Sequence, residues 1–222
     1  MIGFLNDVSL FFISVPLTCT KLADIGFLLD TSSSIRTARN FRFQTQFVKA
    51  VVENFQQYSS NSDTGNVRAA VILYGSKALL KIKLNEFLNL KNFKDALDKR
   101  VRFRGEPLTR IDLALNLANS ELFRKENGDR PNVPNYLVLV TDGRQNSGNY
   151  ITDINLVPRN AAPLWRRNIT IFTVGVGRAR RDQLRAIAGK GGQAIYKKNL
   201  KDLKLAVDEI VPKQCRGIVY IF

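Results

Sequence analysis

Short, nearly continuous apolar runs recur along this chain, and they limit what it can fold into. Four of them lie at residues Ala23–Asp30, Val67–Tyr74, Tyr136–Val140 and Ile169–Val176. A run of this length without polar alternation is typical of a strand that is buried on both faces, as in a parallel sheet covered by helices. Helical periodicity appears between the runs, which predicts an α/β fold.

The segments between and after these runs complete the predicted sheet. Gly75-Ser76 is too short for a helical crossover, so the segment after it is expected to return as an antiparallel edge strand. The sequence thus predicts a doubly wound, mostly parallel six-stranded sheet with one antiparallel edge strand and helices on both faces. The further elements are the edge strand at 77–84, a short strand at 194–196, and helices around 41–55, 91–100, 111–122, 182–188 and 200–210.

The composition shows no break that would divide the 222 residues into two domains, and one domain is expected over residues 21–213. Residues 1–20 contain the apolar stretch Leu10–Leu17, whose length suits a secretory signal peptide although no basic residue precedes it. The alternatives are a misplaced start or a fragment of a longer chain. Residues 214–222 end abruptly in an apolar tail and are expected to continue into a larger protein. No run of about 20 apolar residues is present, so a membrane span is not expected.

Charge and residue types restrict the chemistry. The chain has 34 Lys and Arg against 19 Asp and Glu, which gives a formal net charge of +15 and favours anionic partners. It has no histidine, which excludes a histidine general base, a Ser-His-Asp triad and the usual histidine-bearing zinc sites. Its two cysteines cannot form a four-cysteine metal cluster. A metal ion in this protein must therefore be held by oxygen atoms.

Two of the predicted strands end in aspartate where an α/β sheet binds its ligands. In the common strand order 3-2-1-4-5-6, the ligand crevice lies between the first and fourth strands, beyond their carboxyl ends. Asp30 ends the first strand, and the alternate spacing of Ser32 and Ser34 places them on the same side of an extended loop. Asp142 follows the fourth strand. Carboxylate and hydroxyl oxygens suit a hard divalent cation such as Mg²⁺, Mn²⁺ or Ca²⁺.

Each of these residues also has an ordinary structural explanation. Serines are common helix caps, and Asp142-Gly143 alone is a normal turn sequence. The combination of Asp-x-Ser-x-Ser after one buried strand with Thr-Asp-Gly after another is more specific than either motif by itself.

Five ordered segments of the chain resemble the von Willebrand factor type A domain. They are ADIGFLLDTSSSI at 23–35, VILYGS at 71–76, LTRIDLAL at 108–115, YLVLVTDG at 136–143 and IFTVGVG at 171–177. The similarity extends over about residues 23–211. The resemblance implies a metal-ion-dependent adhesion site, at which a bound divalent cation captures a carboxylate of a protein partner.

Carried over residue by residue, the resemblance assigns five residues to this site. Two serines would bind the ion directly, two aspartates would act largely through water, and a threonine would join when a partner binds. These residues are Asp30, Ser32, Ser34, Thr109 and Asp142. Mg²⁺ is the cation most expected, with Mn²⁺ and Ca²⁺ as alternatives. Thr31 and Ser33 replace the family's commoner serine and glycine, and Glu106-Pro107 replaces a more glycine-rich segment before Thr109.

The resemblance predicts an extracellular adhesion or matrix-binding module, whose partner is a matrix protein such as collagen that contributes an acidic residue. An enzyme is not predicted, because hydrolysis would need a base or nucleophile near the metal and the chain has no histidine. A phosphotransferase-type aspartate is disfavoured, because Ser32 stands where such sites place a second acid. Two alternatives stay open. One is a basic scaffold that binds glycosaminoglycan or acidic partners without metal, and the other is an intracellular module for nucleic acid, which is the less expected partner.

Cys19 and Cys215 flank the predicted domain. The ends of a compact domain often lie close together, and several extracellular relatives carry such a flanking pair, so the resemblance implies a disulfide and a secreted or cell-surface setting. Two unrelated thiols are the alternative. Asn168-Ile169-Thr170 is a glycosylation sequon that is compatible with this setting.

Three arginines stand within two residues of the expected site residues: Arg36, Arg110 and Arg144. They predict a basic rim that favours acidic partner surfaces, although an arginine-rich chain can place them there by chance. Two further basic clusters make a sulfated glycosaminoglycan a second candidate ligand, and a solvated basic face is the alternative for each. The first comprises Arg178, Arg180, Arg181 and Arg185, and the second comprises Lys197, Lys198, Lys201 and Lys204.

Overall fold

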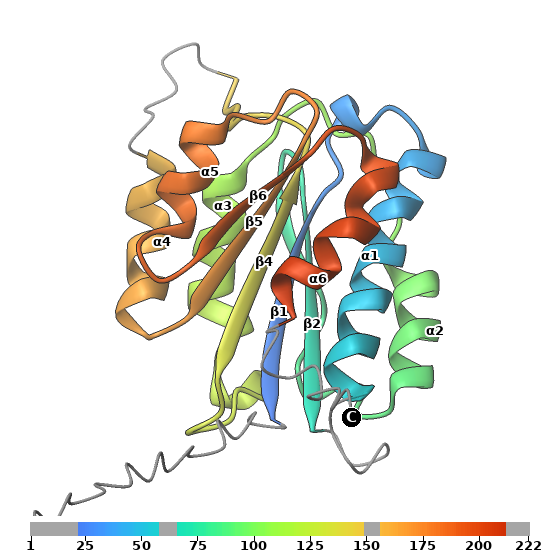
Figure 1. Cartoon of the computed structure of the whole chain (residues 1–222), viewed down its shortest axis with the longest axis vertical. Helices are drawn as coiled ribbons and strands as arrows, with labels where there is room; N and C mark the ends of the chain where they lie inside the picture. The colour runs from blue at the N-terminus through green and yellow to red at the C-terminus, as the bar shows by residue number, and fades with distance from the viewer. Residues whose placement is uncertain (1–21, 58–65, 149–155, 212–222) are drawn as a thin grey trace, which may run out of the picture.

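A six-stranded sheet forms the centre of the computed structural model, which describes residues 22–57, 66–148 and 156–211 (Figure 1). The strand order is β3-β2-β1-β4-β5-β6, and every neighbouring pair is parallel except β2 and β3. The strands are β1 Ala23–Asp30, β2 Val67–Tyr74, β3 Ala78–Ile82, β4 Asn135–Thr141, β5 Thr170–Val176 and β6 Gln193–Lys197. The predicted doubly wound sheet with one antiparallel edge strand is therefore confirmed.

Burial explains why the central strands carry so few polar residues. All eight residues of β1 are buried, since β2 and β4 flank it in the sheet and helices cover both of its faces. Successive side chains of a strand point to opposite faces. Accordingly, Ile25, Phe27 and Leu29 belong to the core on one side of the sheet, and Leu28 belongs to the core on the other side.

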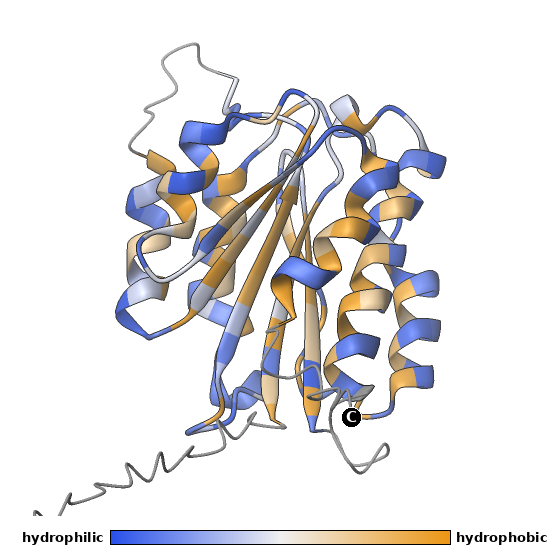
Figure 2. Cartoon of the chain, viewed as in Figure 1, coloured by the Kyte–Doolittle hydropathy of each residue, from blue (hydrophilic) through white to orange (hydrophobic). Residues whose placement is uncertain are grey.

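The helices turn their apolar sides toward the sheet (Figure 2). One layer contains α1 Ala38–Gln57, α2 Leu90–Arg100 and α6 Val207–Ile210, and the opposite layer contains α3 Ile111–Leu117, α4 Leu156–Arg166 and α5 Arg181–Ala188. Short 3-10 helices are η1 Ser33–Ile35, η3 Lys125–Asn127 and η4 Leu200–Ala206. The π-helical segment η2 Ala118–Leu122 continues α3, so the helix predicted at 111–122 changes type halfway.

The sequence patterns do not predict α4, which is the crossover between β4 and β5. The helix contains Pro158 and Pro163, and prolines usually end or kink a helix. Pro158 lies in the first turn, where backbone N–H groups have no partner within the helix in any case. Val157, Ala161 and Leu164 still present a buried face to the sheet. The prolines therefore make this segment look non-helical in the sequence, although the helix forms and packs against the sheet.

The C-terminal element also differs from the single helix that is predicted at 200–210. It is the 3-10 helix η4, which continues into the short α6. Apolar residues of the core recur there at every third position, at Leu200, Leu203 and Ala206. A 3-10 helix has three residues per turn and keeps such a series on one face. The period of three accounts for the change of helix type.

Several predictions concern residues outside the described part of the chain. These residues are the N-terminal segment 1–20, the tail 214–222 and both cysteines, Cys19 and Cys215, so the signal peptide and the disulfide stay predictions. Within residues 22–57, 66–148 and 156–211, no helix is both long enough and apolar enough to cross a bilayer.

Candidate metal centre

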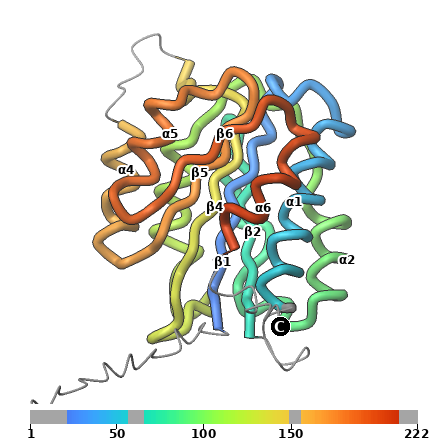
Figure 3. The backbone as a smooth tube through the Cα atoms, viewed as in Figure 1, coloured from blue at the N-terminus to red at the C-terminus, as the bar shows by residue number. Residues whose placement is uncertain are grey.

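The parallel strands end at a common edge of the sheet, at the top of Figure 3, where β1 and β4 are neighbours. Asp30 ends β1 and joins the loops that follow both strands. Its Oδ1 accepts a hydrogen bond of 2.8 Å from the Ser32 N–H, and its Oδ2 accepts one of 2.8 Å from the Thr141 hydroxyl. Gln44 of α1 fixes the Asp30 backbone through hydrogen bonds to its N–H and its C=O. Asp30 is thus held in the predicted crevice between the first and fourth strands.

A row of side-chain oxygens crosses this crevice. The Ser32 and Ser34 hydroxyl oxygens are 2.8 Å apart, and the Ser34 hydroxyl donates to Oδ1 of Asp142 at 2.5 Å. The Ser32 side chain makes no capping bond to η1, and α1 is capped instead by Thr37, which accepts from the Asn40 N–H. The capping explanation for Ser32 therefore does not hold. The two serines and Asp142 form a connected set of oxygen donors.

Thr109 approaches the same crevice from the loop before α3. Its side chain is buried, and its backbone pairs with Asn146 through N–O distances of 3.2 and 2.9 Å. A Cβ placed on Gly143 would lie 3.9 Å from both the Ser34 and the Thr109 hydroxyl oxygens. The structure therefore brings all five expected residues to the ends of β1 and β4, with the Thr109 and Ser34 hydroxyls both close to the turn at Gly143.

Glu106 holds the loop that carries Thr109, a role that the sequence does not reveal. Its backbone bonds to both sides of the serine loop, because Ser33 N–H donates to its C=O and its own N–H donates to Thr31 C=O. Its carboxylate accepts from the N–H groups of Ser76 and Lys77 in the β2–β3 turn. The segment that departs from the family's glycine-rich pattern is thus fastened by a glutamate to two neighbouring loops. No local signal links residues 76 and 106, which lie 30 positions apart.

Burial and mutual repulsion make the two aspartates poor anions without a counter-ion. Burial raises the pKa of Asp30 to about 6, bonds to Ser32 and Thr141 oppose the shift, and the nearby charge of Asp142 adds to it. Burial also raises the pKa of Asp142, against the Ser34 hydrogen bond and the charges of Arg178 and Arg36. A cation between these groups would relieve both effects.

The chemistry of the donor set fits a hard divalent cation. All of its donors are oxygen atoms, from two carboxylates and three hydroxyls. In the residues that the structure describes, no three His, Cys, Asp or Glu side chains gather closely enough to bind a metal by themselves. Any ion held here would therefore depend on the serine and threonine hydroxyls.

The three arginines of the expected rim differ in their surroundings. Both Nε and Nη2 of Arg110 donate to the Asp112 carboxylate, at 2.8 and 2.7 Å, so the charge of Arg110 is compensated within its own loop. Arg36 and Arg144 are exposed beside the crevice. Arg178, which the sequence places in a different basic cluster, acts electrostatically on Asp142 together with Arg36. Arg178 is a neighbour of the site because β5 ends beside β4.

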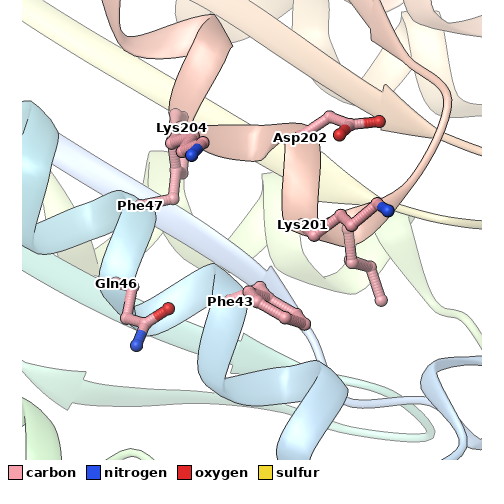
Figure 4. Close-up of a pocket in the computed structure, with 7 residues that line it drawn as sticks. Phe43, Gln46, Phe47, Lys201, Asp202 and Lys204 are labelled. Atoms are coloured by element: carbon pink, nitrogen blue, oxygen red, sulfur yellow. The ribbon is translucent and has the colours of Figure 1, made fainter.

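Two surface depressions lie near this end of the molecule. One has a volume of about 320 Å³, with Ser34 and Asp142 in its wall beside the basic residues Arg36, Arg178 and Lys198. The other has a volume of about 380 Å³ and lies between α1 and η4 (Figure 4). Its lining comprises Phe43, Gln46, Phe47, Leu200, Lys201, Asp202 and Lys204. Only the first depression includes residues of the candidate metal centre.

Comparison with known proteins yields one family and a consistent group of relatives. The model of the von Willebrand factor type A domain matches residues 24–211. The chain is 32% identical to the collagen alpha-5(VI) chain of Mus musculus over 196 residues and 31% identical to matrilin-1 of Gallus gallus over 207 residues. These alignments each cover 88% of this chain, but 7% of the collagen chain and 38% of matrilin-1. The chain therefore spans a minor part of the length of these relatives.

Solved structures share the fold at lower sequence identity. One of them is proximal thread matrix protein 1 from the mussel byssus, in a form whose metal-ion-dependent adhesion site (MIDAS) motif is occupied by zinc. It superposes with a TM-score of 0.76 at 23% sequence identity, and the match covers 89% of this chain and 49% of that chain. A von Willebrand factor type A structure from Catenulispora acidiphila gives a TM-score of 0.67 at 17% identity, covering 89% and 43%. At these identities the likeness concerns the fold alone.

Proposed function

The chain belongs to the von Willebrand factor type A domain family, and from that membership we propose that it is a divalent-cation-dependent adhesion module. The observation that carries the proposal is the row of oxygens at the ends of β1 and β4, in which Ser32, Ser34 and Asp142 are linked by hydrogen bonds. Asp30 stands behind this row, buried and bonded to both loops.

Five residues would hold the cation: Asp30, Ser32, Ser34, Thr109 and Asp142. The neutral hydroxyls would bind the ion directly and the two carboxylates would act largely through water, so the ion would keep an electrophilic character that attracts a carboxylate from another protein. Mg²⁺ is the proposed ion, with Mn²⁺ and Ca²⁺ as alternatives. The mussel thread matrix protein is described with zinc at its MIDAS motif, so Zn²⁺ belongs in any test.

The proposed role is binding and not catalysis. The whole chain has no histidine, and the described crevice offers hydroxyls and carboxylates that are already engaged with one another. The relatives named above are matrix proteins, collagen VI and matrilin-1, which supports a secreted module whose partner is an extracellular matrix protein such as collagen. An acidic side chain of that partner would be the group that the cation captures.

Calorimetric titration of metal into EDTA-stripped protein tests the site directly. Ser34→Ala removes one proposed ligand oxygen, and Ser33→Ala provides a matched control, because Ser33 is exposed in the same loop and its backbone, not its side chain, bonds to Glu106. We expect Ser34→Ala to weaken Mg²⁺ binding by about tenfold or more and Ser33→Ala to change it by less than about twofold. Equal affinities in the two variants would contradict the assignment.

A pull-down from extracellular matrix extract, with Mg²⁺ or EDTA, tests the function that the site would serve. Asp30→Ala and EDTA are both expected to abolish capture, while the circular dichroism of the variant stays that of a folded domain. A basic scaffold that ignores metal would show the opposite pattern, with capture lost at high salt and kept in EDTA. This second function is tested because a net charge of +15 favours anionic partners with or without a metal ion.

A further inference from the structure

The depression beside Ser34 and Asp142 carries a basic wall that the metal centre does not use. Arg36 follows η1, Arg178 follows β5 and Lys198 follows β6, and all three line the same hollow of about 320 Å³. They come from distant parts of the sequence and meet because the parallel strands end at one edge of the sheet (Figure 3). These three positive charges next to the candidate metal site favour the binding of an anionic group.

We propose that this hollow is a second anion subsite, and that the ligand is an acidic peptide segment with two acidic side chains. The first would meet the cation at Ser34 and Asp142, and the second would meet Arg36, Arg178 and Lys198. The inference rests on the proposed function, because it takes the metal centre as the place of the first carboxylate. It adds that the partner is recognised through two acidic side chains and not through one alone.

The basic wall is short of counter-ions. Three neighbouring cations are paired, since Arg180 bonds to Asp182, Lys197 to Glu209 at 2.6 Å, and Arg110 to Asp112 at 2.7 Å. Among the described residues, Arg36, Arg178 and Lys198 form no ion pair. Arg36 and Arg178 do act electrostatically on Asp142, and a cation bound at Asp142 would compete for that interaction. The wall would then be most attractive to a ligand anion when the metal site is filled.

The uncharged part of the lining favours a peptide over a sulfated glycan. The Nδ2 group of Asn40 donates to the Ile35 C=O, and its amide oxygen can accept from a peptide N–H, while the half-buried Leu200 supplies apolar contact. The hollow is also at the small end of the range for ligand pockets, which suits a short segment with alternating charged and neutral groups. A sulfated polysaccharide would be better served by an open row of cations without apolar contacts.

Binding of synthetic peptides tests the subsite. The peptides are blocked at both ends and contain either one glutamate or two glutamates separated by one to three glycines, and they are titrated in Mg²⁺. Arg178→Gln and Lys198→Gln remove charge from the wall, whereas Arg144→Gln is the matched control, because Arg144 is exposed near Asp142 but does not line the hollow. The Mg²⁺ affinity of each variant, measured without peptide, provides a readout that is independent of ligand binding.

With the wild-type protein, the best two-glutamate peptide is expected to bind about tenfold more tightly than the one-glutamate peptide. Each wall variant should reduce this advantage about threefold and leave one-glutamate binding at saturating Mg²⁺ within about twofold. Lys198→Gln should leave the Mg²⁺ affinity within about twofold, and Arg178→Gln should not weaken it, because it removes a positive charge that acts on Asp142. Arg144→Gln should preserve the advantage. Equal binding of both peptide types, or equal losses for both in the wall variants, would overturn the subsite.

The same titrations separate this inference from the function on which it rests. If peptide binding needs Mg²⁺ and Ser34 but ignores Arg178 and Lys198, the subsite is wrong and the adhesion function stands. If the advantage of the second glutamate depends on Arg178 yet persists in EDTA and in Ser34→Ala, the metal-dependent function is wrong. A heparin oligosaccharide that binds through Arg178, with no peptide binding at all, would show that the partner class is wrong.

Discussion

Asp30 is the residue at which burial and charge conflict most directly in this domain. Its carboxylate is fully buried at the end of β1 and accepts hydrogen bonds from Ser32 and Thr141, and within the described part of the chain no cationic side chain pairs with it. Desolvation dominates these bonds and raises the pKa to about 6. At neutral pH the metal-free domain therefore carries a buried negative charge that lowers its folding stability, as expected for a metal site without its cation.

Replacing this charge should stabilise the metal-free domain. Asp30→Asn keeps an acceptor for the Ser32 N–H and removes the ionisation, so we expect the free energy of unfolding in EDTA at about pH 7.5 to rise by about 1–3 kcal/mol. Urea unfolding measures the change. In Mg²⁺ the order should reverse, because only the wild-type protein gains stability from bound metal.

The same pKa fixes the sign of the pH dependence. Because the folded-state pKa lies above the ordinary value of 3.8, protonation of Asp30 favours the folded state. The wild-type domain in EDTA should therefore gain stability, from this group, as the pH falls from about 7 toward about 4, and Asp30→Asn should lack that part of the gain. A wild-type domain that is more stable than Asp30→Asn at pH 7.5 without metal would contradict the assigned cause.

The site residues differ in how far the sequence can reveal them. Asp30 ends a buried strand, and Ser32, Ser34 and Asp142 come within a few residues after one, so strand order and local spacing are enough to group them. Glu106 acts through bonds to Ser76 and Lys77, a pairing that only the folded chain brings together. Arg178 lies beside the centre because β5 is next to β4, a proximity that its grouping with Arg180, Arg181 and Arg185 in the sequence does not reveal.

At the scale of elements, the sequence predicts all six strands and most of the helices, but it does not predict α4 or the type of each helix. A buried strand is marked by its own apolar run, as in β1 and β4, and its environment changes little along its length. Helix type depends on finer spacing. In η4 the apolar residues recur at every third position, a spacing that also fits one side of an α-helix. In α4 two prolines interrupt the sequence, so the residues of its buried face do not indicate a helix.

The C-terminal η4 packs on α1, and a pair of leucines tests the register of this contact. Leu203 is 1% exposed within the core, whereas Leu205 is 57% exposed two positions later. Leu203→Ala should lower the free energy of unfolding by about 2–4 kcal/mol, and Leu205→Ala should change it by less than about 0.5 kcal/mol. Chemical denaturation of both variants in EDTA measures the difference. Similar losses would mean that the segment presents a different face to α1.

At the scale of the whole molecule, the net charge of +15 is expected to raise the rate of association with an anionic partner more than the stability of the complex. The charge alone points to an anionic partner without saying where it binds. The strand topology supplies the location, because it collects uncompensated cations beside the aspartates of the candidate metal centre. Capture would then combine long-range attraction by the whole surface with a short-range, metal-dependent contact.

These two contributions separate by their dependence on salt. Raising NaCl from about 50 to about 500 mM should slow association with an acidic matrix ligand about tenfold, because screening shortens the reach of the surface charge. Dissociation in Mg²⁺ should change by less than about twofold, since the carboxylate–cation contact is local. Surface plasmon resonance with wild type and Ser34→Ala measures both rates. If high salt instead abolished binding in Mg²⁺, and EDTA left low-salt binding unchanged, the basic surface alone would be the binding site.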